Sequence, residues 1–316
     1  MLAARNCLPL ESSWLACFPN CRKSFVSFAG FVRKKEIMKA IKPILFLCAA
    51  LCFATACKKE VDMTLMQKTL FENTDIQQIE VSDAWQVTVI ADSNTYVELE
   101  YSAYLEEHLS VNMNSNQLKI NFKDAIHPAI GSVYKAIVHT THFNKLEVDE
   151  ASVLNFEGSF SSDNDTLNII LKGASQCSGL NNGGKYNNVS VEDASKFVGF
   201  QLDGTNNLVY VKNASICKGN FETRFHFLAV LSNASQLVTY DGSAPYGQLT
   251  LQDDCLANMV QTEIRELNIN LSGASEATVN VTDQMTGSLT ETSTLYYKGF
   301  PQINVECSED SQLIPF

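Results

Sequence analysis

Arginine is scarce in this chain once its N-terminal region is set aside. Eight of the 23 Lys and Arg residues and two of the 35 acidic residues precede Cys57, so the rest of the chain has a net charge of −18. The arginines left in that part are Arg224 and Arg265. Such a chain repels nucleic acid and anionic membranes, and clusters of arginine or lysine that bind phosphate or acidic polysaccharide are missing. We therefore expect no nucleic-acid partner.

Motifs of familiar catalytic and cofactor sites are also absent. The sequence has no glycine-rich phosphate loop, no CxxC pair and no nucleophile elbow. His139 and His142 stand three residues apart in a predicted strand, so their side chains face opposite sides and do not readily chelate one ion. We therefore expect no catalytic residue and no cofactor, and we interpret the protein as a non-enzyme.

Residues 1–57 differ from the rest because they hold six of the ten cysteines and a basic stretch followed by an apolar one. Met38 begins a positive segment, and Pro43 to Phe53 is an apolar segment too short to span a bilayer. The following Ala-Thr-Ala-Cys resembles a bacterial lipobox, in which the chain is cut before a cysteine that then carries lipid. Ordinary signal-peptide cleavage, with Cys57 incidental, is the alternative.

The leader predicts a location in the cell envelope. We expect Met38 to be the true start, residues 38–56 to be a signal peptide and Cys57 to be lipidated. The protein is then anchored to the outer membrane through this lipid alone, at the cell surface or on the periplasmic face.

An Ala-Ser pair returns at a fixed interval in LKGASQCSGL, VEDASKFVGF, VKNASICKGN and LSNASQLVTY, which begin at residues 171, 191, 211 and 231. Extending the register gives seven equivalent positions with one spacing of 23 residues and five of 20. An internal period of this length is typical of a solenoid. The equivalent positions are Ala151, Ala174, Ala194, Ala214, Ala234, Asp254 and Ala274.

Apolar and polar residues alternate around each of these positions. The residues three and five places before it and three places after it are apolar, and the residue directly before it is Asn, Asp, Gly or Glu. Alternation with period two predicts a strand with one buried face, and Asn, Asp or Gly predicts a turn. Each unit is therefore a strand, a corner, a second strand and a polar return, with the alanine at the tight inner side of the corner.

Stacked units of this kind predict an all-β protein, a parallel β-helix (solenoid) with rungs of about 20 residues. The regular β-helix is expected over residues 143–306, after a less regular N-terminal β part over 72–142. Residues 58–71 are interpreted as a linker and 307–316 as a tail. One further rung is expected early in the irregular part, with four residues facing inward: Ile79, Val81, Ala84 and Val87.

The serines that follow the alanines are a candidate nucleophile or glycan-binding row, but they have no fixed histidine partner. We expect their hydroxyls to bond one another and the corner backbone. The corner acids are a possible Ca²⁺ site, with Asp193, Asp253 and Asp254 as weak candidates. Turn propensity alone explains these acids. The serines are Ser152, Ser175, Ser195, Ser215, Ser235 and Ser275.

Cys177 and Cys217 fall in one inward column, two units apart. Stacked strands lie about 4.8 Å apart, so these residues should be separated by about 10 Å, beyond the reach of a disulfide. We predict free thiols that act as small core side chains. The sequence leaves the pairing of Cys255 and Cys307 open.

Three segments resemble a known family. These are IEVSDAWQVTVIADSNTYVELEYSAYLEEHLSVNMNSNQLKINF near the start, the rung LSGASEATVN and the ending LYYKGFPQINV. They resemble the putative auto-transporter adhesin, head GIN domain family of Bacteroidetes lipoproteins, over about residues 72 to 306. Asn or Asp here often replaces the glycine of that family's rungs. The resemblance implies a right-handed β-helix exposed to the periplasm or the cell exterior.

The leading interpretation is a cell-envelope lipoprotein that acts as an adhesin or surface binding module, with a glycan or a host or cell-surface protein as partner. The alternatives are a β-helical glycan-active enzyme, hydrolase or lyase, and a purely structural outer-membrane scaffold. Outward positions that change from rung to rung are expected to carry the function; examples are Lys172, Glu192, Lys212 and Gln252.

Overall fold

The computed structural model describes residues 61–161 and 166–316. The predicted signal peptide and Cys57 lie outside the described residues, so the lipid anchor stays a prediction. Val61–Phe316 forms one compact unit with its own hydrophobic core, as expected of a domain that folds on its own. Within the two described ranges, no helix is long and apolar enough to cross a membrane.

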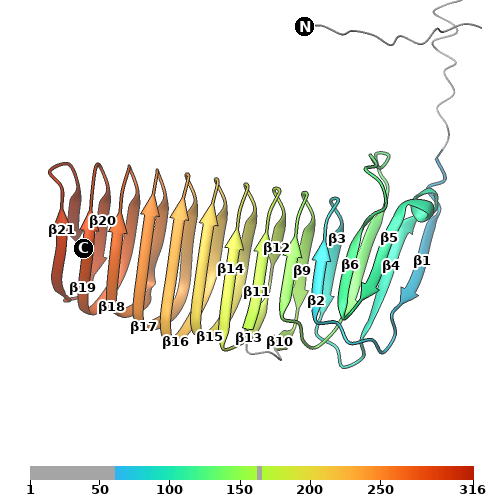
Figure 1. The fold of residues 1–316 in the computed structure, drawn as a ribbon, viewed down its shortest axis with the longest axis horizontal. Coiled ribbons are helices and arrows are strands. Elements are labelled where there is room, and N and C mark those ends of the chain that lie inside the picture. The colour runs from blue at the N-terminus through green and yellow to red at the C-terminus, as the bar shows by residue number, and fades with distance from the viewer. Residues whose placement is uncertain (1–60, 162–165) are drawn as a thin grey trace, which may run out of the picture. The chain divides into compact units, whose positions relative to one another are not determined.

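This unit is a β-solenoid of about eight turns with rungs of roughly 20 residues, which confirms the predicted fold class (Figure 1). Its short 3₁₀ helix spans Ala103–His108. The strands are β1 (Leu65–Leu70), β2 (Gln78–Val81), β3 (Gln86–Ile90), β4 (Tyr96–Ser102), β5 (Leu109–Asn114), β6 (Gln117–Phe122), β7 (Tyr134–His139), β8 (Lys145–Val148), β9 (Val153–Glu157), β10 (Ser159–Ser161), β11 (Thr166–Leu171), β12 (Gln176–Ser178), β13 (Asn181–Gly183), β14 (Tyr186–Val191), β15 (Lys196–Lys212), β16 (Ile216–Ser232), β17 (Gln236–Gln252), β18 (Leu256–Leu271), β19 (Glu276–Leu289), β20 (Thr294–Lys298), β21 (Gln302–Cys307) and β22 (Gln312–Pro315).

Each rung contributes a strand before the Ala-Ser corner and a strand after it, and these form two sheets that face each other. We call them the pre-corner sheet and the post-corner sheet. The long strands β15 to β19 each begin in the post-corner sheet and pass through a second bend into the pre-corner sheet. We call this second bend the lower bend, because it lies opposite the corners in Figure 1.

The strand pairing confirms the apolar columns that the repeat predicted. In the pre-corner sheet Val189 pairs with Val209, Val209 with Ala229, and Ala229 with Leu249. All four side chains are buried. The apolar side chains of both sheets therefore meet between the sheets, and their burial drives the stacking of the rungs.

The structure corrects the predicted role of the corner alanines. From the Glu150-Ala151 corner to the Asp253-Asp254 corner, both central residues have positive φ, as in Asn213 (57°) and Ala214 (60°), which is the backbone of a type I′ turn. At the Gly273-Ala274 corner only Gly273 does. The alanines are exposed, and the serine that follows each of them points inward. The small side chain is thus needed because a left-handed backbone tolerates a bulky Cβ poorly.

Part of the buried serine column bonds the corner backbone, as expected, but Ser152 Oγ and Ser215 Oγ are buried without a hydrogen-bond partner. Ser235 Oγ donates to the Ser232 carbonyl oxygen at 2.8 Å. Ser175 Oγ lies 3.3 Å from Ser195 Oγ of the next rung. Cys255 occupies the same column, and its Sγ donates to the Gln252 carbonyl oxygen at 3.0 Å. A buried serine column that bonds in this way is a structural feature of the corner.

Cys177 and Cys217 are free thiols, which confirms the prediction. Phe197 stands between them in the post-corner sheet, since it pairs with both. Burial raises the pKa of both thiols, so they stay protonated at neutral pH and behave as core side chains. Cys255 and Cys307 are also unpaired.

The N-terminal end of the solenoid does not follow chain order. β2 lies between β6 and β8, and β3 lies between β7 and β9. The isolated rung is therefore in register with the regular stack, with Ile79 opposite Leu146 and Val87 opposite Leu154. Chain segments that come later in the sequence cover its outer side. Trp85, not Ala84, is the buried corner residue of this rung.

The predicted linker and tail are shorter than expected. Residues 65–70 form β1, which pairs antiparallel with β4, and residues 312–315 form β22, which pairs with β20. These strands lie at the two ends of the post-corner sheet, where few of their side chains are buried. An exposed edge strand has no apolar alternation, and therefore gives no signal in the sequence.

Candidate functional site

The corner acids do not gather into a metal site. Asp193 Oδ1 accepts a hydrogen bond of 2.8 Å from Asn213 Nδ2, and Asn213 Oδ1 accepts one of 2.8 Å from Asn233 Nδ2. Asp253 and Asp254 both have positive φ at their own corner. In the part of the chain that the structure describes, no three His, Cys, Asp or Glu residues are arranged to hold a metal ion. Turn geometry and the side-chain ladder account for these residues.

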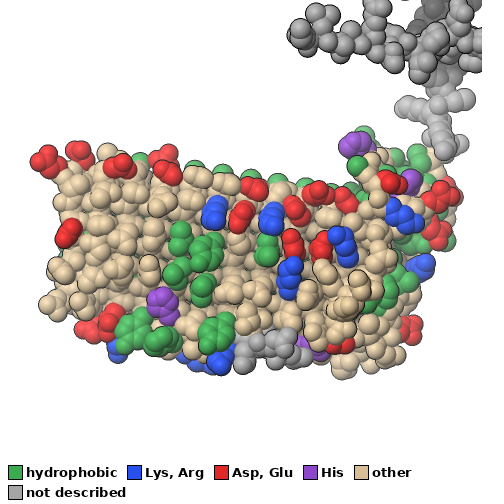
Figure 2. Space-filling model, in the orientation of Figure 1, with side chains coloured by type: hydrophobic (Ala, Val, Ile, Leu, Met, Phe, Trp, Pro, Cys, Tyr) green, Lys and Arg blue, Asp and Glu red, His purple; other side chains and the backbone are tan. Residues whose placement is uncertain are grey.

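The outward residues just before the corners form a row of mixed charge (Figure 2). Lys172 Nζ lies 3.5 Å from Glu147 Oε1, and Glu192 Oε1 accepts a hydrogen bond of 2.6 Å from Ser190. Lys212 Nζ lies 5.9 Å from the ring centroid of Tyr210. Gln252 is exposed in the same row. Among these four residues, an ion pair within 4 Å in the described part of the chain is made by Lys172 alone.

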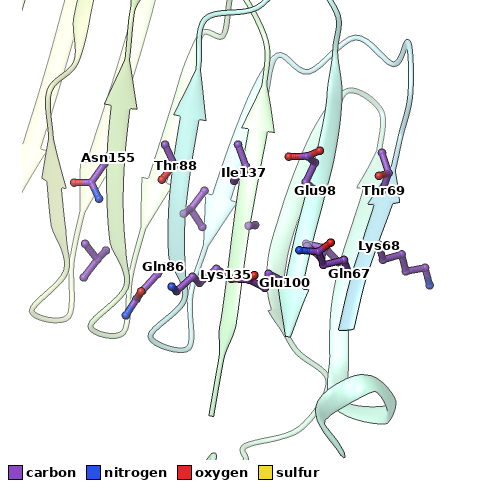
Figure 3. Close-up of a pocket in the computed structure, with 14 residues that line it drawn as sticks. Gln67, Lys68, Thr69, Gln86, Thr88, Glu98, Glu100, Lys135, Ile137 and Asn155 are labelled. Atoms are coloured by element: carbon purple, nitrogen blue, oxygen red, sulfur yellow. The ribbon is translucent and has the colours of Figure 1, made fainter. Parts of the chain in front are cut away.

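A hollow of about 550 Å³ lies on the outer side of the post-corner sheet near its N-terminal end (Figure 3). It crosses five strands in the order β9, β3, β7, β4 and β1. Two rows of outward side chains line it, each with one residue from every strand. The first row is Val153, Gln86, Lys135, Glu100 and Gln67, and the second is Asn155, Thr88, Ile137, Glu98 and Thr69.

Most of the lining groups are hydrogen-bonding side chains on a rigid sheet. Amides and hydroxyls lie among two carboxylates, Glu98 and Glu100, and two ammonium groups, Lys68 and Lys135, and Ile137 and Val153 supply apolar surface between them. Five strands about 4.8 Å apart span roughly 19 Å. A row of this length, with donors and acceptors at fixed positions, can hydrogen-bond an extended polar chain and pack against its apolar groups.

Past the second row, the same sheet holds a histidine between two acids. The imidazole of His139 stacks on Tyr96, with ring centroids 4.0 Å apart and the planes within 9°. Its Nδ1 lies 3.3 Å from Asp92 Oδ2, and its Nε2 lies 3.8 Å from Glu98 Oε2. A hydrogen bond from the Asn94 backbone lowers the pKa of Asp92. Of these groups, Glu98 also lines the hollow. His142 instead bonds Asp75 at 2.8 Å, so the two histidines do not converge.

Sequence reasoning missed this hollow because its strands are not consecutive. β3 and β9 are neighbours in space, yet 62 residues separate the end of one from the start of the other. The antiparallel strands β4 and β1 lie outside the repeat altogether. The available signal was the run of polar outward residues at Gln86 and Thr88, and it does not reveal which strands lie beside them.

The comparisons with known proteins agree with this architecture. A family model described as putative auto-transporter adhesin, head GIN domain, matches residues 75–301. The structure of a putative adhesin from Parabacteroides distasonis has a TM-score of 0.59 at 13% identity, over 81% of this chain and 98% of that one. A putative adhesin from Parabacteroides merdae has a TM-score of 0.59 at 12% identity, over 80% and 96%. These two likenesses show the fold. No protein with a curated description matches.

Proposed function

This chain belongs to the putative auto-transporter adhesin, head GIN domain family, and on that premise we propose that it is a lipid-anchored adhesin that binds a glycan at the cell surface. The observation that carries the proposal is the polar hollow across β9, β3, β7, β4 and β1. Its side chains are held by a sheet on which the neighbouring strands fix the backbone. A ligand therefore meets a preorganised row of donors and acceptors, which lowers the entropy cost of binding.

The ligand that fits this hollow best is an uncharged, extended saccharide. Sugars present hydroxyls along their edges and apolar C–H groups on their faces, which match the amides and hydroxyls and the Ile137 and Val153 side chains. Lys135 and Glu100 pair directly across β7 and β4, so the first row has no net charge. A strongly charged ligand has no counter-charge there.

The binding proposal predicts a position-specific loss of affinity. In residues 61–316, the double variant Gln86→Ala and Asn155→Ala should bind a glycan-array hit at least about tenfold more weakly, since each lost hydrogen bond is worth about 1 kcal/mol. The matched control is Gln236→Ala, the same residue type in the same outward column but outside the hollow. It should bind as the unchanged protein does.

Three results would contradict the proposal. If the double variant keeps full affinity, the hollow is not the binding site. If no glycan or matrix component binds, the scaffold interpretation takes its place. New reducing ends or unsaturated sugars released from a bound glycan would show a β-helical enzyme instead, with Glu98 and Glu100 as the first carboxylates to replace.

Anchoring by lipid is a separate part of the proposal. Seven residues, 58–64, lie between Cys57 and the start of β1 at Leu65. Full-length protein with Cys57→Ala, made in cells that process bacterial lipoproteins, should lose incorporation of labelled fatty acid and leave the membrane fraction. Unchanged labelling of this variant would disprove lipidation at Cys57.

A further inference from the structure

The lower bend gathers both arginines of the described unit together with exposed aromatic rings. Phe225 is 56% exposed and Tyr186 is 39% exposed. We call this surface the aromatic edge; its residues are Lys185, Tyr186, Arg224, Phe225, His226, Tyr246, Arg265 and Glu266. Figure 2 shows hydrophobic, basic and histidine side chains along this margin of the solenoid. These residues are far apart in the sequence but close in the structure, because the solenoid places equivalent positions of successive rungs side by side.

Strand pairing aligns the edge residues of successive rungs, and Asn206 fills the rung between Tyr186 and His226. Tyr186 pairs with Asn206, Asn206 with His226, and His226 with Tyr246, so successive positions are about 4.8 Å apart. This series runs along the length of the solenoid. A chain-like ligand lying on it meets a new side chain at every rung.

The aromatic and cationic groups hold one another in place. The rings of Phe225 and Tyr246 meet edge to face, with centroids 5.5 Å apart. The Arg265 guanidinium lies 5.3 Å from the centroid of Tyr246, and its Nη2 is 3.1 Å from the Tyr246 hydroxyl and 2.8 Å from Glu266 Oε1. These contacts restrict the rotamers of Tyr246 and Arg265, which reduces the entropy lost when a ligand binds.

A shallow hollow of about 160 Å³ adjoins this cluster. Its size is on the scale of a single sugar ring. The ring of Tyr246 forms one side, and carboxylate, amide and hydroxyl groups complete it, from Glu266, Asn268, Gln284 and Thr286. An aromatic ring beside convergent polar groups matches the apolar face and the hydroxyl edge of a saccharide.

The charge of the edge differs from that of the rest of the unit. Residues 61–316 contain 13 basic and 32 acidic side chains. The residues that define the aromatic edge include three cations and one acid, and the exposed acids Glu222 and Glu263 lie in the same bend. Arg265 is paired with Glu266, but Arg224 has no ion pair among the described residues and is exposed. A free guanidinium binds a carboxylate in a bidentate manner.

We propose that the aromatic edge is a second binding surface, specific for a saccharide chain that carries carboxylates. Tyr246 stacks on a sugar ring seated in the adjoining hollow, and Arg224 pairs with a carboxylate of the same chain. This revises the expectation that two arginines are too few for an acidic polysaccharide, since the fold brings both to one edge. The aromatic edge is separate from the hollow across β9 to β1. This second proposal therefore does not depend on whether a glycan binds in that hollow.

The test compares charged and uncharged probes on residues 61–316 by calorimetric titration. The charged probes are oligogalacturonate and sialyllactose, and the uncharged ones are their carboxyl-reduced counterparts. Charged probes should bind at least about tenfold more tightly, and raised salt should weaken only their binding. Arg224→Gln should remove this preference, whereas Tyr246→Ala should weaken both kinds of probe. Lys172→Gln, which removes a cation from the row before the corners, is the matched control and should change nothing.

Three outcomes would overturn the proposal. These are no binding of either charged probe, equal affinity for the reduced probes, and unchanged selectivity in Arg224→Gln. Equally tight binding of poly-glutamate would assign the edge to an acidic peptide. The double variant of Gln86 and Asn155 should still bind the charged probes, which keeps this test distinct from that of the first hollow.

Discussion

Replacing Trp85 with serine, the residue that most other rungs carry at this position, is expected to destabilise the solenoid by about 3–5 kcal/mol. Trp85 is fully buried at the corner of the rung formed by β2 and β3. Its ring lies 5.6 Å from Phe122 and 5.9 Å from Tyr134, and these two rings are 5.5 Å apart. Serine there leaves a cavity that the rigid sheets on both sides cannot close.

The matched variant for this prediction is Trp85→Phe. Phenylalanine keeps most of the ring volume and removes the indole N–H, which is buried without a hydrogen-bond partner. Trp85→Phe should lower the free energy of unfolding by only about 1 kcal/mol. Urea unfolding followed by circular dichroism compares the midpoints of the two variants. If serine is tolerated as well as phenylalanine, the aromatic cluster does not anchor the N-terminal end of the stack.

The regular rungs could be predicted because each local signal repeats seven times and points to the same structure. An alternation such as Val189-Ser190-Val191 is ambiguous alone, but the same pattern 20 residues later fixes strand, face and register together. The free state of Cys177 and Cys217 followed from register alone. Predictions of this kind rest on the spacing of strands, which is nearly constant among β-sheets.

The corner alanines show what the repeat pattern in the sequence does not predict. A column of small apolar residues is compatible with an inner position and with an exposed left-handed one. Asn213 indicates the turn, but the backbone of a two-residue turn decides which of Ala214 and Ser215 points inward. Side-chain hydrophobicity is a weaker constraint here than the steric limit on φ.

The order of the N-terminal strands and the two binding surfaces depend on tertiary structure. No local feature of the sequence specifies that β2 lies between β6 and β8, because every strand in this part of the sheet has a similar inner face. The hollow and the aromatic edge could not be predicted for the same reason, since each combines residues from several rungs. His226 and Tyr246 could have been placed side by side only if the lower bend were known to keep the 20-residue register.

The second large effect is expected for Gly287→Ala, which should lower the free energy of unfolding by about 3 kcal/mol or more. Gly287 pairs with Ile269, in the column where every earlier rung has an apolar side chain, so the repeat alone suggests that a larger residue should fit better. The backbone of Gly287 has φ of 127°, a conformation in which side chains are strained. A Cβ built there lies 1.9 Å from the Ile269 carbonyl oxygen, which is held by the sheet.

Strain and overpacking add at this position, since each costs about 1–3 kcal/mol. For a domain of this size, the melting temperature should fall by about 6–12 °C. Gly183→Ala is the matched control, because a Cβ at Gly183 meets nothing within 4 Å and its φ is not positive; its melting temperature should change by less than about 2 °C. Equal melting temperatures for the two variants would mean that the chain at Gly287 is free to shift. In that case the last rungs would be held by their inner side chains alone, without the close backbone packing that Gly287 allows.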